Sequence, residues 1–143
     1  MNWLLLVYKI PREPTARRVY VWRKLKRLGA LALQDAVWLL PATPWTREQL
    51  QWLAAEINEL EGTATFWEAA LLPPGQEADL VRQFQAEVDQ VFQAILADLE
   101  QPDADLAALA RRYQQAQAQD YFHSALGQQA RAALLAAQGG TDS

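Results

Sequence analysis

The sequence lacks cysteine entirely and contains a single histidine, His123. The absence of cysteine excludes disulfide frameworks, thiolate nucleophiles, iron–sulfur clusters and cysteine-based zinc sites, and one histidine argues against a histidine-rich metal centre. Long apolar runs are missing too, because the run over residues 3–8 is far shorter than the roughly 20 residues that span a bilayer. We therefore expect a cytoplasmic protein with no membrane partner, no metal and no cofactor.

Recognisable catalytic motifs are also missing. The chain has no nucleophile elbow, no glycine-rich phosphate loop and no zinc-ligand spacing. Carboxylate pairs do occur, for example Glu56 with Glu59 and Asp103 with Asp105. At helix surfaces and helix starts such pairs usually serve solvation and capping. We expect no enzymatic activity and no catalytic residue.

The hydrophobic pattern over residues 1–75 predicts the order strand, helix, strand, strand, helix, strand. The apolar run 3–8 predicts a central strand, the short runs 30–33 and 36–40 predict a hairpin, and residues 63–72 predict a fourth strand. This order is that of an α+β, ferredoxin-like βαββαβ sheet, with two helices on one face of an antiparallel sheet. Residues 1–75 are thus expected to form the ferredoxin-like domain.

Each of the two predicted helices in this domain has a start signal and an apolar stripe. Thr15 is expected to cap the first helix, which ends at Gly29 and has apolar residues at helical spacing: Val19, Trp22, Leu25 and Leu28. The second helix is expected to begin with a capping box at Thr46, with Trp45 packing against Leu50. Most of the six tryptophans fall at apolar positions, so we expect them in the core or in an interface.

The remaining residues, 76–143, have the composition of helices rich in alanine and glutamine. They predict a C-terminal bundle of two to three helices packed on the sheet domain, because apolar residues recur at three- and four-residue spacing from Leu80 to Leu99. In the first strand both faces are apolar. The second face of the sheet therefore needs a cover, either these helices or another copy of the chain, and we expect a homodimer.

Charge is divided unevenly along the chain. Residues 1–30 contain eight basic residues and one acid, Glu13, for a net charge of +7, whereas the other 113 residues contain five basic and sixteen acidic residues, for −11. This asymmetry predicts an anion-facing end on an acidic body. The alternative is that the acidic helices of the same molecule neutralise the basic helix.

The basic residues gather around the start of the first helix and along it. Arginine and free backbone N–H groups at a helix N-terminus favour tetrahedral oxyanions, and here the residues that converge are Lys9, Arg12, Arg17 and Arg18. The patch continues along the helix as DNA-binding proteins often show, with Arg23, Lys24, Lys26 and Arg27. Among these arginines Trp22 is a candidate for base stacking or a cation–π contact.

Four segments of the chain resemble a known family. Residues 3–29 and 33–41 read WLLLVYKIPREPTARRVYVWRKLKRLG and LQDAVWLLP, and RRY at 111–113 and DYF at 120–122 follow later. They resemble the N-terminal domain of the ChrB chromate-resistance proteins. The resemblance implies a bacterial cytoplasmic protein that senses chromate and regulates a chromate-efflux operon by binding DNA. Full ChrB proteins carry a further C-terminal domain, so this chain is expected to be a stand-alone form or a fragment.

The first 41 residues resemble, more distantly, the ferredoxin-like domain of the phenylacetate-catabolism repressor and of the CRISPR adaptation nuclease. In that nuclease an aspartate ends the first strand and binds metal, whereas Tyr8 and Lys9 stand here. A nuclease is therefore the least favoured function. Magnesium-dependent cleavage of nucleic acid that is lost when Glu68 or Asp35 is replaced by alanine would support the nuclease function.

Chromate is a tetrahedral dianion, so the resemblance and the charge pattern favour the same residues. Our leading hypothesis is a chromate-responsive regulatory or sensor protein in which Arg12, Arg17 and Arg18 contact the oxyanion, and promoter DNA is bound by Lys9, Arg23, Lys24 and Arg27. The alternative is a non-catalytic oligomerisation or partner-docking module whose basic helix meets an acidic helix of a neighbour.

Overall fold

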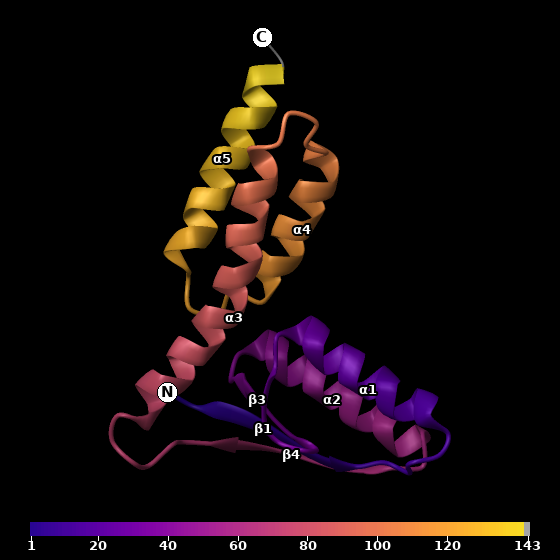
Figure 1. The fold of residues 1–143 in the computed structure, drawn as a ribbon. Coiled ribbons are helices and arrows are strands. Elements are labelled where there is room, and N and C mark those ends of the chain that lie inside the picture. The colour runs from indigo at the N-terminus through magenta and orange to yellow at the C-terminus, as the bar shows by residue number, and fades with distance from the viewer. Residues whose placement is uncertain (142–143) are drawn as a thin grey trace. The chain divides into compact units, whose positions relative to one another are not determined.

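The computed structural model describes residues 1–141, and the chain divides into two compact units, Met1–Glu77 and the residues from Ala78 onward (Figure 1). The first contains β1 (Trp3–Lys9), α1 (Thr15–Leu28), β2 (Leu31–Gln34), β3 (Val37–Pro41), α2 (Pro44–Glu59) and β4 (Thr63–Ala69). Then follow α3 (Gln76–Leu99), α4 (Leu106–Ala118) and α5 (Ala125–Thr141). The predicted α+β class is confirmed, with four strands and five helices in residues 1–141.

The four strands form one antiparallel sheet in the order β2-β3-β1-β4. The central strand β1 pairs with β3 from Trp3↔Pro41 onward and with β4 along its whole length. A central strand is shielded on both sides, which suits a run that is apolar on both faces. The edge strand β2 is short, and its register with β3 shifts between Ala32 and Gln34.

Helices α1 and α2 lie side by side over one face of the sheet (Figure 1). Strand alternation points Leu4 and Leu6 toward them, together with their cross-strand neighbours Leu40 and Trp38. The helices contribute their own buried residues to this core: Val21, Leu25, Leu28, Leu50, Leu53 and Ile57. At about 1.5–3 kcal/mol for each large aliphatic side chain, this burial is the main stabilising contribution to the unit.

The opposite face of the sheet is only partly buried. Trp3 and Leu39 are almost inaccessible, at 2% and 3% exposure, but Val7 is 41% exposed and Trp67 59% exposed. The indole N–H of Trp3 donates to Glu77 Oε1 at 3.1 Å. On this face Val7 of β1 and Trp67 of β4 therefore remain accessible to solvent.

The start of each helix in this unit differs from the prediction. Helix α1 begins at Thr15 itself, and its N-cap is Pro14, which makes no side-chain cap, so Thr15 does not cap the helix. Helix α2 begins at Pro44, so its N-cap is Thr43 and not Thr46. The two threonines form a reciprocal box, in which Thr43 Oγ1 accepts from Thr46 N at 3.0 Å and Thr46 Oγ1 accepts from Thr43 N at 2.9 Å. Proline at the first helical position moves the start three residues upstream, because its fixed φ suits that position.

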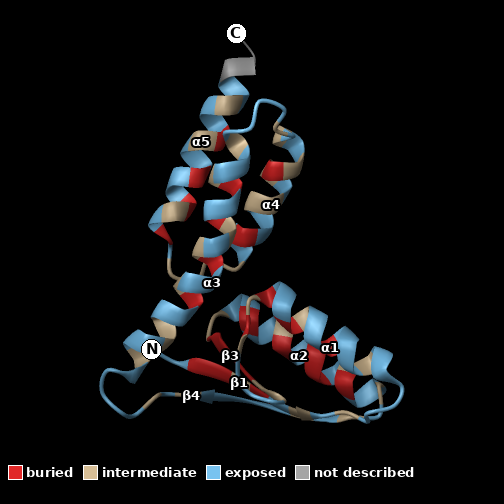
Figure 2. Ribbon diagram, in the orientation of Figure 1, coloured by how far each residue is buried: buried red, intermediate tan, exposed pale blue. Residues whose placement is uncertain are grey.

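Of the two places predicted for the tryptophans, core or interface, the core holds only Trp3 and Trp38. Trp3 and Trp38 are buried, but four others are not, with exposures of 50%, 42%, 64% and 59% for Trp22, Trp45, Trp52 and Trp67. Figure 2 shows that exposed residues make up much of α1 and β4. On α1 the buried stripe starts at Val21, not at Val19 and Trp22. Both stripes have helical spacing, so periodicity alone does not decide which one faces the sheet. Trp45 lies inside the first turn of α2 and is 42% exposed, so it is not the residue before the N-cap that the predicted staple to Leu50 requires.

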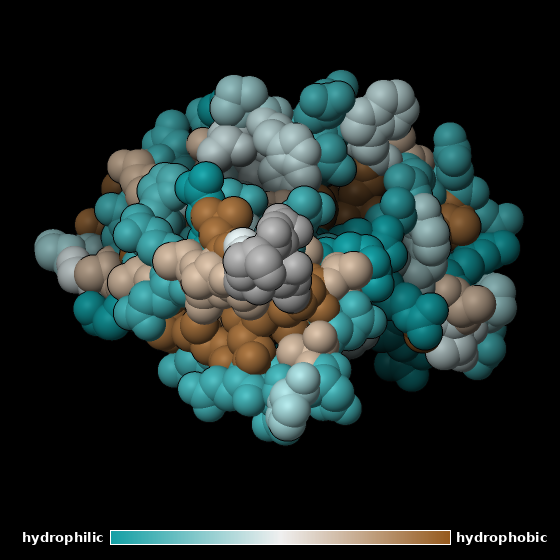
Figure 3. Space-filling view, turned by 90° about the horizontal axis from the view of Figure 1, so that it is seen from above, coloured by the Kyte–Doolittle hydropathy of each residue, from teal (hydrophilic) through white to brown (hydrophobic). Residues whose placement is uncertain are grey.

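The second unit is a bundle of three helices around one core, which confirms the predicted two to three. Its buried residues come from all three helices: Val88, Phe92, Ile95, Leu109, Ala116, Ala130 and Leu134. Phe92 is fully buried, and Gly127 of α5 packs so closely on its ring that a Cβ atom there would lie 2.8 Å from it. No helix of the described residues is long and apolar enough to cross a membrane. Figure 3 shows apolar atoms gathered at the end of this unit, surrounded by hydrophilic ones.

The segment between α4 and α5 holds the start of α5 by polar contacts. Ser124 is buried, its backbone N–H donates to Asp120 Oδ1 at 2.9 Å, and its hydroxyl donates to Asp89 of α3. Every polar atom of a buried serine needs such a partner. These contacts tie α5 to α3 inside the unit.

Candidate anion-binding and nucleic-acid interface

Four element ends meet at one corner of the first unit. The last residue of β1, Lys9, pairs with Thr63 at the start of β4. Gly62 precedes that strand and packs against the backbone, since a Cβ atom there would lie 2.5 Å from Lys9 O. Arg17, from the first turns of α1, reaches the end of α2 and donates to Leu60 O at 3.2 Å. The corner therefore brings Lys9 and Arg17 to the same end of the sheet.

Arg17 has a carboxylate partner that the sequence did not reveal. Its guanidinium lies 3.2 Å from Glu61 Oε2, and the two side chains are 30% and 77% exposed. An ion pair this exposed contributes at most about 1 kcal/mol. A bound dianion would therefore compete with Glu61 for Arg17 at small cost. No local pattern marks Glu61 as this partner, because it lies 44 residues away in the chain.

The other two predicted anion-binding arginines are exposed. Arg12 lies in the loop before α1, Arg18 lies in its first turns, and neither makes an ion pair with any residue in 1–141. The first turn of α1 holds no acidic residue and has no side-chain cap. Backbone N–H groups and the helix dipole therefore favour an anion at this end.

The outer face of α1 combines cations with exposed aromatic rings. Arg18, Trp22 and Lys26 follow one another at four-residue spacing, and Lys26 Nζ lies 5.8 Å from the centre of the Trp22 ring. Together with Arg23, which is also exposed, these residues are called here the basic face of α1. The combination suits nucleic acid, because cations contact phosphates and rings stack on bases.

The flank of α1 toward α2 meets acids instead. The Tyr20 hydroxyl donates to Glu56 of α2, and this hydrogen bond, followed by burial and the Glu56 charge, raises the pKa of Tyr20. Lys24 Nζ lies 5.5 Å from the centre of the Tyr20 ring, and the positive charge of Arg27 partly opposes the rise in the pKa of Tyr20. Two predicted DNA contacts, Lys24 and Arg27, therefore lie on the acid-facing flank.

The charge of the first unit reflects this arrangement. It contains nine basic and eight acidic residues, so its net charge is only +1. The flank next to α2 places Glu56 beside Tyr20, whereas neutralisation of the whole basic helix by acidic helices of the same molecule stays a prediction. The basic face of α1, by contrast, keeps Arg18 and Arg23 exposed.

The carboxylates considered for a nuclease are placed apart. Glu68 accepts from Arg47 Nε at 2.9 Å and from Asn2 at 3.2 Å, and the Arg47 hydrogen bond lowers the pKa of Glu68. Asp35 lies exposed in the turn between β2 and β3. Among residues 1–141 no three acidic or histidine side chains gather as a metal site requires.

Comparison with known proteins identifies related sequences. The family described as "Protein ChrB, N-terminal" matches residues 18–108. Protein ChrB of Cupriavidus metallidurans is 38% identical over 77 residues, which cover 54% of this chain and 24% of that protein. The similarity thus spans about a quarter of the relative's length. No solved structure matches.

Proposed function

Because this chain belongs to the ChrB N-terminal family, we propose that it is a regulatory or sensor protein of a bacterial chromate-resistance system. In this proposal it acts in the cytoplasm, has no catalytic step, binds a chromate-like oxyanion at the start of α1, and contacts DNA through the basic face of α1. The observation that carries the proposal is that α1 presents exposed cations and rings on a helix without a single acid.

The oxyanion site is supported by three features of one helix end. The first turn of α1 has no side-chain cap, Arg12 and Arg18 are exposed, and Arg17 is held only by an exposed pair. A tetrahedral dianion accepts several hydrogen bonds at once, and arginine supplies them in a fixed planar geometry. We expect Arg12 and Arg18 to bind the oxyanion first and Arg17 to join by leaving Glu61.

Titration calorimetry with chromate tests this site. Hydrogen bonds to charged groups contribute about 1.5–3 kcal/mol each, so Arg12→Glu with Arg18→Glu, which removes two such donors, should weaken binding by about a hundredfold or more. The matched control is Arg111→Glu with Arg131→Glu, two exposed arginines of the second unit. Equal affinity of both double variants for chromate would refute the assignment, and sulfate competition measures selectivity.

DNA binding is tested by its dependence on salt. The logarithm of affinity falls with the logarithm of salt concentration by about 0.9 for each phosphate contact. Arg18→Ala with Arg23→Ala should therefore reduce this slope by about 2 on the protein's own upstream DNA, whereas Arg131→Ala should leave it unchanged. If the slope is the same in the wild-type protein and in both variants, the basic face of α1 does not contact DNA.

The partner-docking function is the second candidate, and the exposed tryptophans favour it. Trp45 and Trp52 lie on α2 at 42% and 64% exposure, on a helix that also carries Glu48, Glu56 and Glu59. Tryptophan is enriched at the centres of protein interfaces. Binding of a protein partner that Trp52→Ala abolishes, with no measurable DNA binding, would support this candidate over the regulator.

We also propose that the first unit has the ferredoxin-like arrangement. The observed element order βαββαβ and the central position of β1 and β3 support it. An experimental structure of the full chain tests this arrangement through the strand order and the face that carries both helices.

A further inference from the structure

Strand β4 is an edge of the sheet, and nothing in its sequence or geometry blocks pairing with a further strand. It pairs with β1 over seven residues in an unbroken register, from Trp3↔Ala69 to Lys9↔Thr63. It contains neither proline nor lysine and has no bulge. Proteins usually protect long edges with such devices, because an open edge pairs with other strands.

The opposite edge of the same sheet is protected. Strand β2 has only four residues, and its register with β3 is interrupted between Ala32 and Gln34. A short strand with an irregular register is a poor template for another strand. The two edges therefore differ, and only β4 presents a long regular edge.

The charge on β4 is already neutralised. Its one ionisable residue is Glu68, next to the end of the strand, and this carboxylate is paired with Arg47 of α2. The rest of the strand is threonine, alanine, phenylalanine and tryptophan. A partner strand would thus meet no unpaired charge on this edge.

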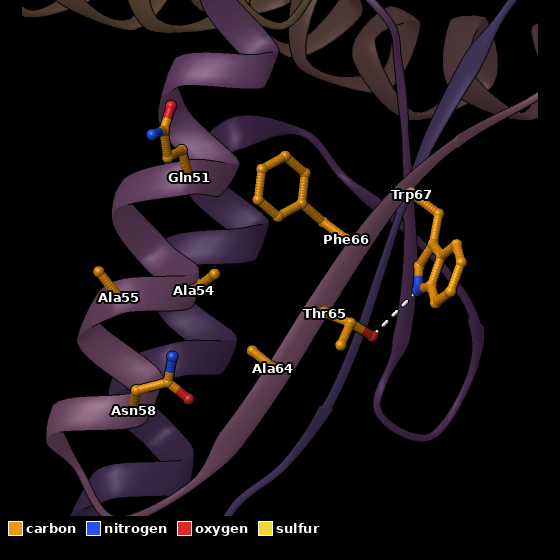
Figure 4. Close-up of a pocket in the computed structure, with 8 residues that line it drawn as sticks. All are labelled: Gln51, Ala54, Ala55, Asn58, Ala64, Thr65, Phe66 and Trp67. Atoms are coloured by element: carbon orange, nitrogen blue, oxygen red, sulfur yellow. Dashed lines mark hydrogen bonds between the residues drawn. The ribbon is translucent and has the colours of Figure 1, made fainter.

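Both faces of β4 carry an exposed aromatic ring. Figure 4 shows Phe66 pointing toward α2 and Trp67 pointing away from it, with the Trp67 indole donating to Thr65 Oγ1 at 2.9 Å. Between α2 and β4 lies an open groove of about 490 Å³, lined partly by the small side chains of Ala54, Ala55 and Ala64. A strand placed beside β4 would cover both rings, and its side chains on the helix-facing side would enter this groove.

We propose that the occupant of this edge is β4 of a second copy of the chain, paired antiparallel about a two-fold axis at Phe66. In a two-fold symmetric homodimer, the same surface of each copy contacts its equivalent on the other copy. The register places Thr65 opposite Trp67 of the second copy and Ala64 opposite its Glu68. No like charges face each other, and the Thr–Trp pair extends the contact already seen within one strand. The two sheets join into one continuous sheet.

This interface is separate from the surface assigned to oxyanion and DNA. Helix α2 packs over β4 and lines the groove beside it. The dimer therefore leaves the basic face of α1 uncovered. The inference goes beyond the proposed function, and its failure would leave that function untouched.

Light scattering coupled to size-exclusion chromatography tests the dimer on the full chain. The wild-type protein should run at twice its chain mass of 16.1 kDa. Thr65→Lys with Trp67→Lys places two pairs of lysines face to face across the axis, so the dimer should dissociate. Thr65→Lys with Trp67→Glu replaces each repulsive pair with an attractive one, and this variant should remain dimeric at concentrations where the double-lysine variant is monomeric. Both positions are exposed, so circular dichroism should show an unchanged fold.

Cross-linking tests the register, and the chain is suited to it because it has no native cysteine. Phe66→Cys lies on the proposed axis, so a short bismaleimide should link two copies efficiently. The control is Leu33→Cys on the other edge, at a residue that is 45% exposed. A monomeric wild-type protein would overturn the proposal, as would cross-linking that is stronger at position 33 than at position 66. Pairing only with an added unrelated peptide strand, and not with itself, would also overturn it.

Discussion

Replacing Gly62 with alanine tests how tightly the corner between β1 and α2 is packed. The added Cβ would lie 2.5 Å from Lys9 O and 2.8 Å from Ile57 Cγ2, both far inside van der Waals contact. Neither neighbour gives way easily, because Lys9 is held in the β1–β4 register and Ile57 is fully buried. Overpacking of this kind costs about 1–3 kcal/mol, and we expect about 2 kcal/mol. For a unit of 77 residues the Tm should fall by roughly 8–16 °C.

Thermal and urea unfolding followed by circular dichroism measures this loss. The matched control is Gly139→Ala in α5, where nothing lies within 4 Å of the added Cβ. In a helix, alanine is favoured over glycine by about 0.5–1 kcal/mol, so this variant should be unchanged or slightly more stable. If the Gly62→Ala protein unfolds at the wild-type temperature, the corner is not packed as described, and the placement of Lys9 beside Gly62 loses its support.

Three further substitutions test other parts of the fold. Thr46→Val removes the buried hydroxyl that donates to Pro41 O at 2.6 Å, and the unpaired carbonyl should lower the free energy of unfolding by about 1–3 kcal/mol in urea. Phe92→Ala empties the centre of the helical bundle and should cost about 3–5 kcal/mol by the same measurement. Glu68 has a lowered pKa, so its pairing with Arg47 stabilises the fold above the unfolded-state pKa and less as pH falls through the folded-state pKa. The Tm difference between wild type and Glu68→Gln should therefore shrink on acidification.

Hydrophobic periodicity predicts an element well where the pattern fits only one type of secondary structure. The apolar run from Trp3 to Tyr8 has the length of a strand and is followed by Pro11 and Pro14, so it predicts a strand, and β1 is found there. The long seam from Leu80 to Leu99 predicts α3 for a similar reason. Helix starts are harder to place, because several threonines compete for the capping role. Thr43 takes it for α2, since Pro44 fits the first helical position.

The candidate site was predicted only in outline. The cluster of cations on one helix is visible in the sequence, and so is its N-terminal anion preference. The acidic partners of this helix are not visible in the sequence, because they lie far along the chain. Glu61, in the turn after α2, pairs with Arg17, and Glu56 of α2 accepts from the Tyr20 hydroxyl. Periodicity predicts Trp22 on the buried side of its helix, but the stripe of Val21, Leu25 and Leu28 faces the sheet and leaves Trp22 outside.

The sequence by itself determined the α+β class, the order of the elements and the separation of basic and acidic segments. These properties depend on local spacing and composition, which a single chain displays directly. Only the tertiary structure decided which cations stay exposed, which tryptophans remain on the surface and which edge of the sheet is open. Each of these depends on contacts between residues distant in the chain, and the packing of two helices on one sheet creates those contacts.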